Sequence, residues 1–596
     1  MKFEEWTSLP AMFFENAALY HDRPFLWAKK DGRYKGRTYG KAAEQVSLLT
    51  RGLEDCGLGI GDRVVLVSEN RPEWAIAHFA IMAFGGITVP AYVTNTADDH
   101  QHVISNVEAR AVIVSNRRLL DPVLKAVEKL NCVKTVILME KAEAEVPAGV
   151  TLLAMDEVMQ RGAKRPDLVV DRLRRLKRTD AACIIHTSGT GGLPKGVTLS
   201  HGAILFNCMG AHDLLLEFGL IHEIFLSFLP LSHSYEHLAG LIFPVSIGAE
   251  VYYAESIDKL AANMLEVRPT IMTAVPRLYE TMRGRIMRGL ESAGGLKRGM
   301  FNRTLALGRK KYETPDRLTV IDRIADRVLD RLVRDKVRAR FGGRLKALVS
   351  GGGPLNYDVG LFFTSLGLTI LQGYGQTEAA PVISANRPSS LRIESVGPPV
   401  KDVKVEIARD GEILVQGEMV MKGYWNDPES TAAAIDENGW LHTGDIGRID
   451  MDGHIVITDR KKDIIVNSGG DNISPQRVEG ILSLEPEVAQ CMVYGDRHPH
   501  LVALVVPDEE FMKSWAEENH KVADMALLAA DPDFAKAYAG VLARVNERLS
   551  SIERIRRVLI AEAPFSVDNE QMTPTMKVRR HILKQVYGKR LEELYG

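Results

Sequence analysis

Hydroxyl, glycine and lysine residues gather in one short run, residues 187–196, which reads Thr-Ser-Gly-Thr-Gly-Gly-Leu-Pro-Lys-Gly. Three hydroxyls and the Lys195 ammonium offer hydrogen bonds and charge to an anion, and the glycines let backbone N–H groups approach it closely. The run is not a P-loop, because Pro194 precedes the lysine and Gly196 follows it. An ordinary hairpin would explain the glycines alone. The full combination predicts a phosphate-binding loop.

The elements that position this loop are expected to be strands. Residues 181–185 form a short apolar run before the loop, and residues 197–199 form another after it. Both are typical of buried strands. The loop is therefore predicted to join two strands, without a helix dipole behind it.

Short β-branched runs alternate with helix-like segments through the first 180 residues. We expect strands at 63–67, 87–91 and 111–114, and a helix over 72–84, which is typical of layered α/β folds with largely parallel sheets. Two later strands, 345–349 and 368–371, run into glycine-rich segments. Ligands bind beyond the carboxyl ends of such strands, although plain turns explain these glycines equally well.

Composition limits the class of protein. The chain has 596 residues, 45% hydrophobic residues and a formal net charge of -2, which favours several globular domains and disfavours a general nucleic-acid binder. Its five cysteines lack C-x-x-C spacing, and the N-terminus lacks the pattern of a signal peptide. The most apolar window, residues 75–92, divides into a helix and a strand rather than a membrane span. We therefore expect a cytoplasmic protein.

Residues 277–344 differ in composition from the rest of the chain, because they are rich in arginine and lysine. They also contain an apolar stripe at helical spacing: Ile321, Ile324, Val328 and Leu332. One interpretation is a surface helix that packs its stripe on the core. The other is a peripheral membrane contact through an amphipathic helix with a basic face. The first is favoured, because aspartates dilute the positive face: Asp322, Asp326, Asp330 and Asp335.

Four more segments carry groups able to do chemistry. Residues 372–378 place Tyr374, Thr377 and Glu378 on one predicted loop. A predicted strand ends at Asp445, residues 459–463 follow a second strand, and residues 573–580 contain Lys577. Each segment alone is equally compatible with a solvated loop.

Together and in this order, these segments resemble the adenylate-forming superfamily of acyl-CoA synthetases, which includes firefly luciferase and the adenylation domains of nonribosomal peptide synthetases. The usual loop of that family reads T-S-G-T-T-G-x-P-K-G, and this chain departs from it only at Gly191. The resemblance spans nearly the whole chain. It implies a large N-terminal domain of layered α/β subdomains (1–458), a hinge at Lys462 (459–464), and a smaller mobile α+β C-terminal domain (465–596).

The resemblance assigns ATP and Mg²⁺ to particular residues. The phosphate loop would hold the β- and γ-phosphates through Thr187, Ser188, Gly189, Thr190 and Lys195. Glu378 and Thr190 would bind Mg²⁺, as oxygen ligands suit this ion. Tyr374 would stack on adenine, and Asp445 and Arg460 would bind the ribose. The other nucleotide positions carried over are Gly352, Gly353, Pro354, Gln372, Gly373, Gly375 and Ile457.

The catalytic set implied is Lys577, Thr377, Glu378 and Lys195. Thr377 would donate to the α-phosphate, and Lys577 would bridge it to the carboxylate. His233, in the run 229–237, would border the acyl pocket together with Tyr235 and Gly351. Gly469 and Gly470 would line the CoA channel.

The implied reaction is ATP-dependent activation of a fatty acid to an acyl adenylate, with pyrophosphate release, followed by transfer to CoA. A long-chain acid is expected, because residues 277–344, 509–549 and 573–580 resemble the long-chain branch. Three alternatives stay open: an acyl-AMP ligase that loads a carrier protein, an inactive nucleotide- or lipid-binding homologue, and a luciferase-like monooxygenase. Self-association is compatible with any of them.

Overall fold

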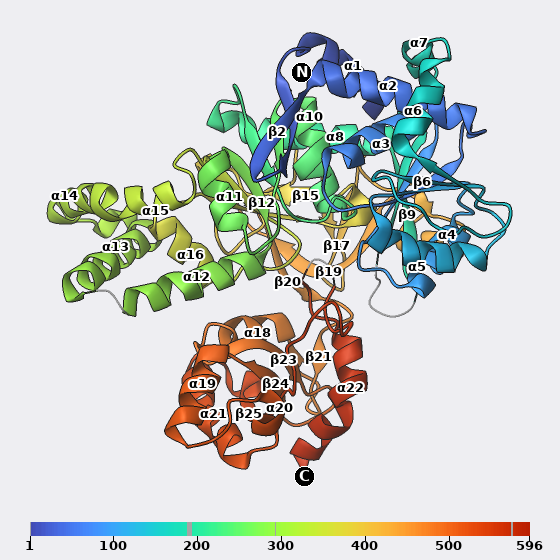
Figure 1. Ribbon diagram of the computed structural model, residues 1–596. Coiled ribbons are helices and arrows are strands. Elements are labelled where there is room, and N and C mark those ends of the chain that lie inside the picture. Colours follow the sequence, from blue (N-terminus) through green and yellow to red (C-terminus); the bar gives the residue numbers. More distant parts are fainter. Residues whose placement is uncertain (1, 188–192, 292–293, 574–575) are drawn as a thin grey trace.

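The computed structural model describes residues 2–187, 193–291, 294–573 and 576–596. They form a large lobe and a smaller C-terminal lobe below it in Figure 1. The described residues of the large lobe hold two eight-stranded sheets and one four-stranded sheet, and the small lobe adds a three-stranded sheet and a two-stranded ribbon. The α/β class with a large and a small domain is therefore confirmed.

The first large sheet has the strand order β18-β9-β8-β4-β3-β5-β6-β7. The six strands from β8 to β7 pair in parallel, and β9 and β18 add antiparallel at one edge. The predicted strands before residue 180 are confirmed. The bounds are β3 (Arg63–Val67), β4 (Ile87–Ala91), β5 (Ala111–Val114), β6 (Thr135–Leu138), β7 (Thr151–Ala154), β8 (Ala181–Thr187), β9 (Lys195–Ser200) and β18 (Gly423–Tyr424).

The second large sheet has the order β15-β14-β13-β12-β10-β11-β1-β2. Its inner strands are parallel, and β15 and β2 close the edges antiparallel. The bounds are β1 (Pro24–Lys30), β2 (Arg33–Thr38), β10 (Ile224–Ser227), β11 (Glu250–Tyr253), β12 (Ile271–Ala274), β13 (Ala347–Ser350), β14 (Ile370–Gly375) and β15 (Val382–Ala385).

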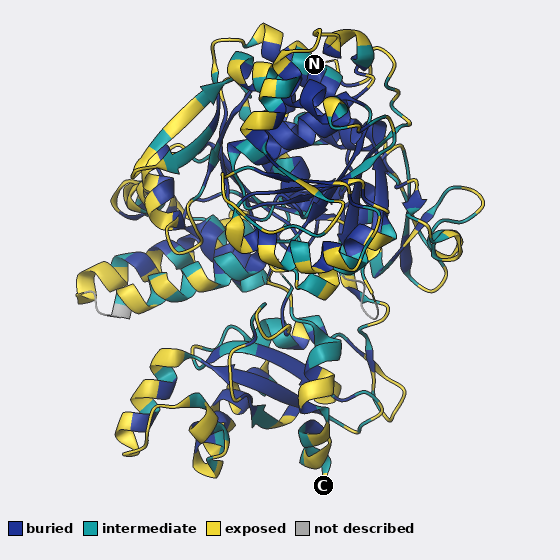
Figure 2. Ribbon diagram, turned by 45° about the vertical axis from the view of Figure 1, so that its right-hand side comes forward, coloured by how far each residue is buried: buried dark blue, intermediate teal, exposed yellow. Residues whose placement is uncertain are grey.

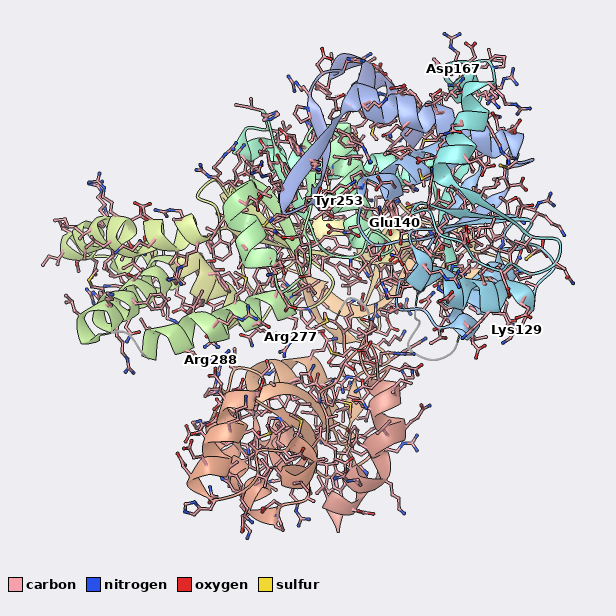
Figure 3. The ribbon with its side chains drawn as sticks, in the orientation of Figure 1. Lys129, Glu140, Asp167, Tyr253, Arg277 and Arg288 are labelled. Carbon is pink, nitrogen blue, oxygen red and sulfur yellow. The ribbon has the colours of Figure 1, made fainter. Side chains whose placement is uncertain are left out.

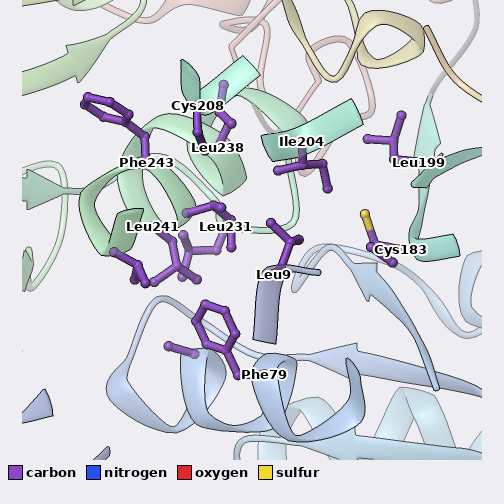
Figure 4. Close-up of a cluster of buried hydrophobic side chains, with 14 of the residues drawn as sticks. Leu9, Phe79, Cys183, Leu199, Ile204, Cys208, Leu231, Leu238, Leu241 and Phe243 are labelled. Atoms are coloured by element: carbon purple, nitrogen blue, oxygen red, sulfur yellow. The ribbon is translucent and has the colours of Figure 1, made fainter. Parts of the chain in front are cut away.

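Helices and a shared core hold these sheets together. In Figure 4, Leu9 of α1, Phe79 of α3, Cys183 of β8 and Ile204 of α8 point into one buried cluster, which Figure 2 places in the dark interior of the large lobe. The helices are α1 (Leu9–Leu19), α2 (Tyr39–Asp55), α3 (Pro72–Ala83), α4 (Ala97–Asn106), α5 (Arg117–Glu128), α6 (Met155–Ala163), α7 (Val169–Leu173), α8 (His201–Leu215), α9 (Ser234–Glu236), α10 (Phe243–Ser246), α11 (Leu260–Val267), α16 (Tyr357–Ser365) and α17 (Pro428–Ala434).

A four-stranded antiparallel sheet completes the large lobe: β16 (Lys404–Ile407), β17 (Glu412–Gln416), β19 (Leu441–Ile449) and β20 (Ile455–Arg460). Two predictions are wrong here. Asp445 lies in the middle of β19 rather than at a strand end, and residues 372–375 belong to β14 rather than to a loop. Backbone pairing with β15 accounts for the second, because Gly373 and Tyr374 complete a ladder that periodicity does not reveal.

Residues 276–291 and 294–340 form a helical extension at one side of the large lobe (Figure 1). It comprises α12 (Pro276–Glu291), α13 (Gly295–Glu313), α14 (Val320–Leu329), the π-helical turn η4 (Asp330–Arg334) and α15 (Asp335–Arg340). The prediction that the apolar stripe packs on the core is wrong, since Ile321, Ile324, Val328 and Leu332 are exposed. The side of the helix that faces the protein instead carries Asp322, which is buried and forms ion pairs with Arg303 and Lys310 of α13.

The small lobe packs below α12. Its elements are β21 (Ile465–Val466), β22 (Asn472–Ile473), α18 (Pro475–Leu482), β23 (Val488–Tyr494), β24 (Leu501–Pro507), α19 (Glu509–Glu518), α20 (Met525–Ala529), α21 (Pro532–Glu547), β25 (Ile555–Ile560) and α22 (Arg580–Glu592). Arg277 Nη2 donates to the Ala489 carbonyl at 2.6 Å, and Arg288 lies 3.2 Å from Glu510 (Figure 3). Among the described residues, no helix has both the length and the apolar character needed to cross a membrane.

Candidate active site

The predicted phosphate loop follows β8 and leads into β9. The two strands pair antiparallel with Thr187 opposite Lys195, so the prediction that this loop joins two strands is confirmed. Ser188, Gly189, Thr190 and Gly191 lie outside the described residues, and the metal and phosphate roles expected of them stay predictions. The described ends of the loop bring one hydroxyl and one ammonium together at the edge of the first sheet.

Lys195 extends toward the segment after β18. Its Nζ donates to Ser430 Oγ, lies 3.8 Å from Asp427 Oδ2, and stands 5.1 Å from the centre of the Tyr424 ring. Asp427 caps the N-terminus of α17 through Ser430 N. The lysine is thus oriented by contacts that leave about half of its side chain accessible to an anion.

Asp445 is held by partners from two other strands. Tyr374 Oη on β14 donates to Asp445 Oδ2 at 2.7 Å, and Arg460 Nε on β20 donates to Oδ1 at 2.9 Å. Arg460 faces Asp445 directly across the β19–β20 ladder. Burial, reinforced by the Asp445 charge, raises the pKa of Tyr374. Burial alone would lower the pKa of Arg460, but the Asp445 carboxylate outweighs it and raises that pKa.

Thr377 and Glu378 lie on the short 3₁₀ helix η5 (Thr377–Ala379), directly after β14. Thr377 Oγ1 is 2.8 Å from Ser234 Oγ, and Glu378 Oε1 accepts from Tyr424 Oη at 2.9 Å. The other oxygen of Glu378 accepts no hydrogen bond from a described residue. A carboxylate oxygen that remains available in this way fits a Mg²⁺ ligand.

Three of these partners were missed by the sequence analysis. Ser234 lies inside the run 229–237 but carries no signal of its own. Tyr424 is 46 positions from Glu378, and Ser430 is 235 positions from Lys195. Sequence spacing offers no sign of such contacts. The pairing of β18 with β9 brings Tyr424 and the following segment to Lys195, and the hydrogen bond from Met421 N to the Glu378 carbonyl brings Glu378 close to the same strand.

The end of β13 meets α9 at the expected acyl site. Tyr235 Oη donates to the Val349 carbonyl at 2.8 Å, and its ring lies so close to Gly351 that a Cβ there would approach it to 2.9 Å. Gly352 has a φ of +80°, which favours glycine. Gly353 and Pro354 continue this turn.

His233 lies at the N-cap of α9, where its Nδ1 accepts from Tyr235 N at 3.2 Å. Loss of solvation, with the nearby Lys577 charge, lowers the pKa of His233 to about 3. The imidazole is therefore neutral near pH 7. The Lys577 charge that contributes to this shift comes from the small lobe.

The other predicted nucleotide positions lie on two strands of different sheets, β14 and β20. Gln372, Gly373 and Gly375 are residues of β14, and Ile457 is a half-buried residue of β20. A Cβ on Gly375 would lie only 1.8 Å from the Pro381 carbonyl oxygen, so only glycine fits at this position of β14. Gly373 and Gly375 therefore offer the site backbone groups rather than side chains.

Lys577 belongs to the small lobe, in the segment between β25 and α22. It retains solvent contact, yet its pKa is lowered to about 8, by loss of solvation and then by the Arg460 charge, against the opposing pull of Asp445 and Glu378. The charges of Arg460, Asp445 and Glu378 therefore act on this ammonium. An interaction of Lys577 with the nucleotide site was predicted from the sequence only through the family resemblance.

The remaining predicted residues lie apart from this group. Lys462 is exposed in the turn between β20 and β21, next to Lys461, which pairs with Asp410 at 2.6 Å. Gly469 and Gly470 occupy an exposed turn between β21 and β22. The contacts of the described residues do not join that turn to the Asp445 group.

Comparison with known proteins gives a consistent assignment. Residues 13–425 match the family model described as AMP-binding enzyme, and residues 462–596 match the AMP-binding enzyme C-terminal domain. A long-chain-fatty-acid–CoA ligase of Mycobacterium bovis is 34% identical over 99% of this chain and 98% of its own. A peroxisomal long chain acyl-CoA synthetase of Arabidopsis thaliana is 31% identical over 95% of this chain and 82% of its own.

Solved structures share the fold at lower identity. The adenylation domain of a carboxylate reductase from Mycobacterium chelonae superposes with a TM-score of 0.79 at 21% identity, covering 99% of this chain and 91% of that one. A benzoate CoA ligase from Burkholderia xenovorans gives 0.70 at 21% identity, covering 97% and 99%. The chain therefore belongs to the AMP-binding enzyme family, and within that adenylate-forming superfamily to the long-chain acyl-CoA synthetase branch.

Proposed function

We propose that this protein uses ATP to activate a long-chain fatty acid as an acyl adenylate, releasing pyrophosphate, and then transfers the acyl group to CoA. Two observations support the proposal. Tyr374 and Arg460 hold the Asp445 carboxylate, and the Lys577 ammonium of the small lobe interacts electrostatically with Arg460, Asp445, Glu378 and His233 of the large lobe. A protein that only binds nucleotide has no need for a second lobe to deliver a cation there.

In the first half-reaction, the nucleoside is held by the residues around Asp445. The Tyr374 ring stacks on adenine, while Asp445 accepts hydrogen bonds from the ribose hydroxyls and Arg460 keeps the carboxylate ionised. Gly352 and Gly353 let the backbone approach the base. The Tyr374 and Arg460 hydrogen bonds hold Asp445 before ATP arrives, so little ordering is needed on binding.

The fatty acid enters between Tyr235 and Gly351, beside the neutral His233 imidazole. Its carboxylate attacks the α-phosphorus, and the bond to the bridging oxygen of pyrophosphate breaks. Two anions must meet in this step, so Lys577 and Thr377 offset the charge that builds between them. Lys195 and Thr187 hold the departing pyrophosphate. Mg²⁺, when bound at Glu378, neutralises the phosphate oxygens.

In the second half-reaction, the CoA thiolate attacks the acyl carbonyl of the adenylate and AMP leaves. We propose that the small lobe rotates about Lys462. This rotation withdraws Lys577 and brings Gly469 and Gly470 to the acyl adenylate. The contacts to be exchanged include the Arg277–Ala489 hydrogen bond and the Arg288–Glu510 ion pair. Partly solvent-accessible polar contacts such as these are individually weak and exchange readily.

We place this activity in the cytoplasm, because the cysteines lie unpaired as expected of a reducing compartment. A peripheral contact with membranes through residues 277–344 belongs to the proposal, since long-chain acids partition into bilayers. Self-association is compatible with it.

The decisive experiment measures pyrophosphate release and loss of free CoA thiol with ATP, Mg²⁺ and a panel of acids: acetate, benzoate, hexanoate, palmitate and stearate. We expect palmitate or stearate to give the highest kcat/KM, and thiol loss to require ATP and acid together. A preference for acetate or benzoate would overturn the substrate class. Pyrophosphate release without thiol loss would favour transfer to a carrier protein instead.

A further inference from the structure

Helix α14 and the turn η4 present their apolar side to solvent. The exposed aliphatic side chains form one ridge along the helix: Val320 (73% exposed), Ile321 (76%), Ile324 (59%), Val328 (50%) and Leu332 (45%). Single exposed aliphatic residues are ordinary, but a row of five along one continuous helical segment is not. We call these five residues the aliphatic ridge.

The acidic residues of α14 and η4 pair with basic residues outside the arginine row. Asp322, 7% exposed, pairs with Arg303 at 2.9 Å and Lys310 at 2.7 Å, both on α13. Asp326 pairs with Arg334 at 2.7 Å, and Asp330 with Arg338 at 2.8 Å. These pairs neutralise the aspartates that dilute the basic charge in the sequence.

The arginines of α14 and η4 remain outside. Arg323, Arg327 and Arg331 are exposed, and within the described parts of the chain their side chains form no hydrogen bond or ion pair with protein. They follow each other at i, i+4 spacing, directly beside the row of Ile324, Val328 and Leu332. The outer surface of α14 and η4 is therefore both aliphatic and positively charged, since the neighbouring aspartates pair with other arginines, Arg334 and Arg338.

We propose that the aliphatic ridge and its arginine row dock the protein peripherally on the surface of an anionic lipid bilayer. The aliphatic side chains enter the boundary between headgroups and acyl chains, and the guanidinium groups pair with lipid phosphates. This inference locates the membrane contact of the proposed function on one helix. It is independent of the reaction chemistry, because docking requires neither ATP nor CoA.

Charge complementarity favours lipid over a second copy of this chain as the occupant. In a two-fold contact across the ridge, Arg323, Arg327 and Arg331 of each copy would face the same arginines, since the aspartates of α14 already have partners. An anionic bilayer presents no such repulsion. Its negative surface supplies the counter-charge that the arginine row lacks.

The test is cosedimentation of the full-length protein with vesicles of phosphatidylcholine alone, or of phosphatidylcholine with phosphatidylglycerol. Binding is expected only with the anionic lipid, and it should weaken as salt is raised. Two variants separate the contributions: Ile321→Ser/Ile324→Ser/Val328→Ser, and Arg323→Gln/Arg327→Gln/Arg331→Gln. Each should reduce vesicle affinity about tenfold or more. A matched control, Ile60→Ser/Ile221→Ser, changes exposed isoleucines elsewhere and should bind like the wild type.

Circular dichroism and ligase activity on micellar palmitate confirm that each variant is folded, and they report on the proposed function separately from docking. Vesicle binding by all variants at wild-type affinity would overturn the proposal. So would a wild-type dimer that the serine variant converts to a monomer, because the ridge would then contact a second copy. An active enzyme without affinity for anionic vesicles would refute docking while leaving the ligase assignment intact.

Discussion

The candidate active site and helix α14 both place aspartates away from bulk solvent, but with opposite results for function. In the active site, Asp445 is held by Tyr374 and Arg460, and its charge acts on Lys577 of the other lobe. On α14, Asp322 is satisfied by Arg303 and Lys310. The first arrangement prepares polar groups for a ligand, whereas the second leaves apolar groups to face outward. Burial of a charge therefore identifies a site only when its partners are also known.

The largest effect should come from Lys577→Ala. Loss of this cation should lower kcat/KM for adenylate formation by about 10²- to 10³-fold, because two anions then meet without compensation. Transfer to CoA from supplied acyl adenylate should remain near wild type. Pyrophosphate release and thioester formation measure the two steps separately. Lys589→Ala, an exposed lysine of the same lobe, serves as control, and equal loss of both steps in Lys577→Ala would indicate a structural role.

Asp445→Asn should raise the KM for ATP by about 10- to 100-fold, since charge-assisted hydrogen bonds to the ribose and to Arg460 are lost. Steady-state kinetics with saturating palmitate measure it. Tyr374→Phe is the matched control, because it removes the hydrogen bond to Asp445 but keeps an aromatic ring for adenine. An unchanged KM in Asp445→Asn would remove Asp445 from the nucleotide site.

The pH dependence tests the state of Lys577. Its pKa of about 8 means that the protonated form required for charge compensation exists below that pH and is lost as pH rises. In the free enzyme, kcat/KM for adenylate formation should therefore fall about tenfold per pH unit above this pKa. Lys577→Arg should lack this fall, because a guanidinium remains charged. The same fall in that variant would assign the ionisation to another group.

The sequence predicted the architecture wherever one local pattern decided it. The buried run 181–185, the parallel strands of the first sheet and helix α3 were all confirmed, because periodicity and β-branched residues determine them. The position of Asp445 within β19 and the extension of β14 through Gly375 were not predictable, since both depend on pairing with distant strands.

The orientation of α14 could not be predicted from the sequence either, for a different reason. Periodicity shows that a helix has an apolar side and a charged side, but not which side faces the protein. The choice depended on Arg303 and Lys310 of α13, which bind Asp322. The contacts of Lys195 with Ser430 and of Glu378 with Tyr424 could not be predicted from the sequence, because they join segments far apart in it. The roles of Lys577 and of the glycines at 469–470 came from the resemblance alone, and they remain predictions.

The smallest effect on catalysis should come from the aliphatic ridge itself. Ile321→Ser/Ile324→Ser/Val328→Ser should leave kcat/KM without lipid within about twofold of wild type, and each change should shift the free energy of unfolding by only about 0.5 kcal/mol, because exposed side chains lose little burial. Leu329→Ala, on the buried side of the same helix, should instead cost about 2–5 kcal/mol. Urea unfolding measures both. If the serine variant proves as unstable as Leu329→Ala, the ridge packs against protein in solution, and the contrast between the active site and α14 disappears.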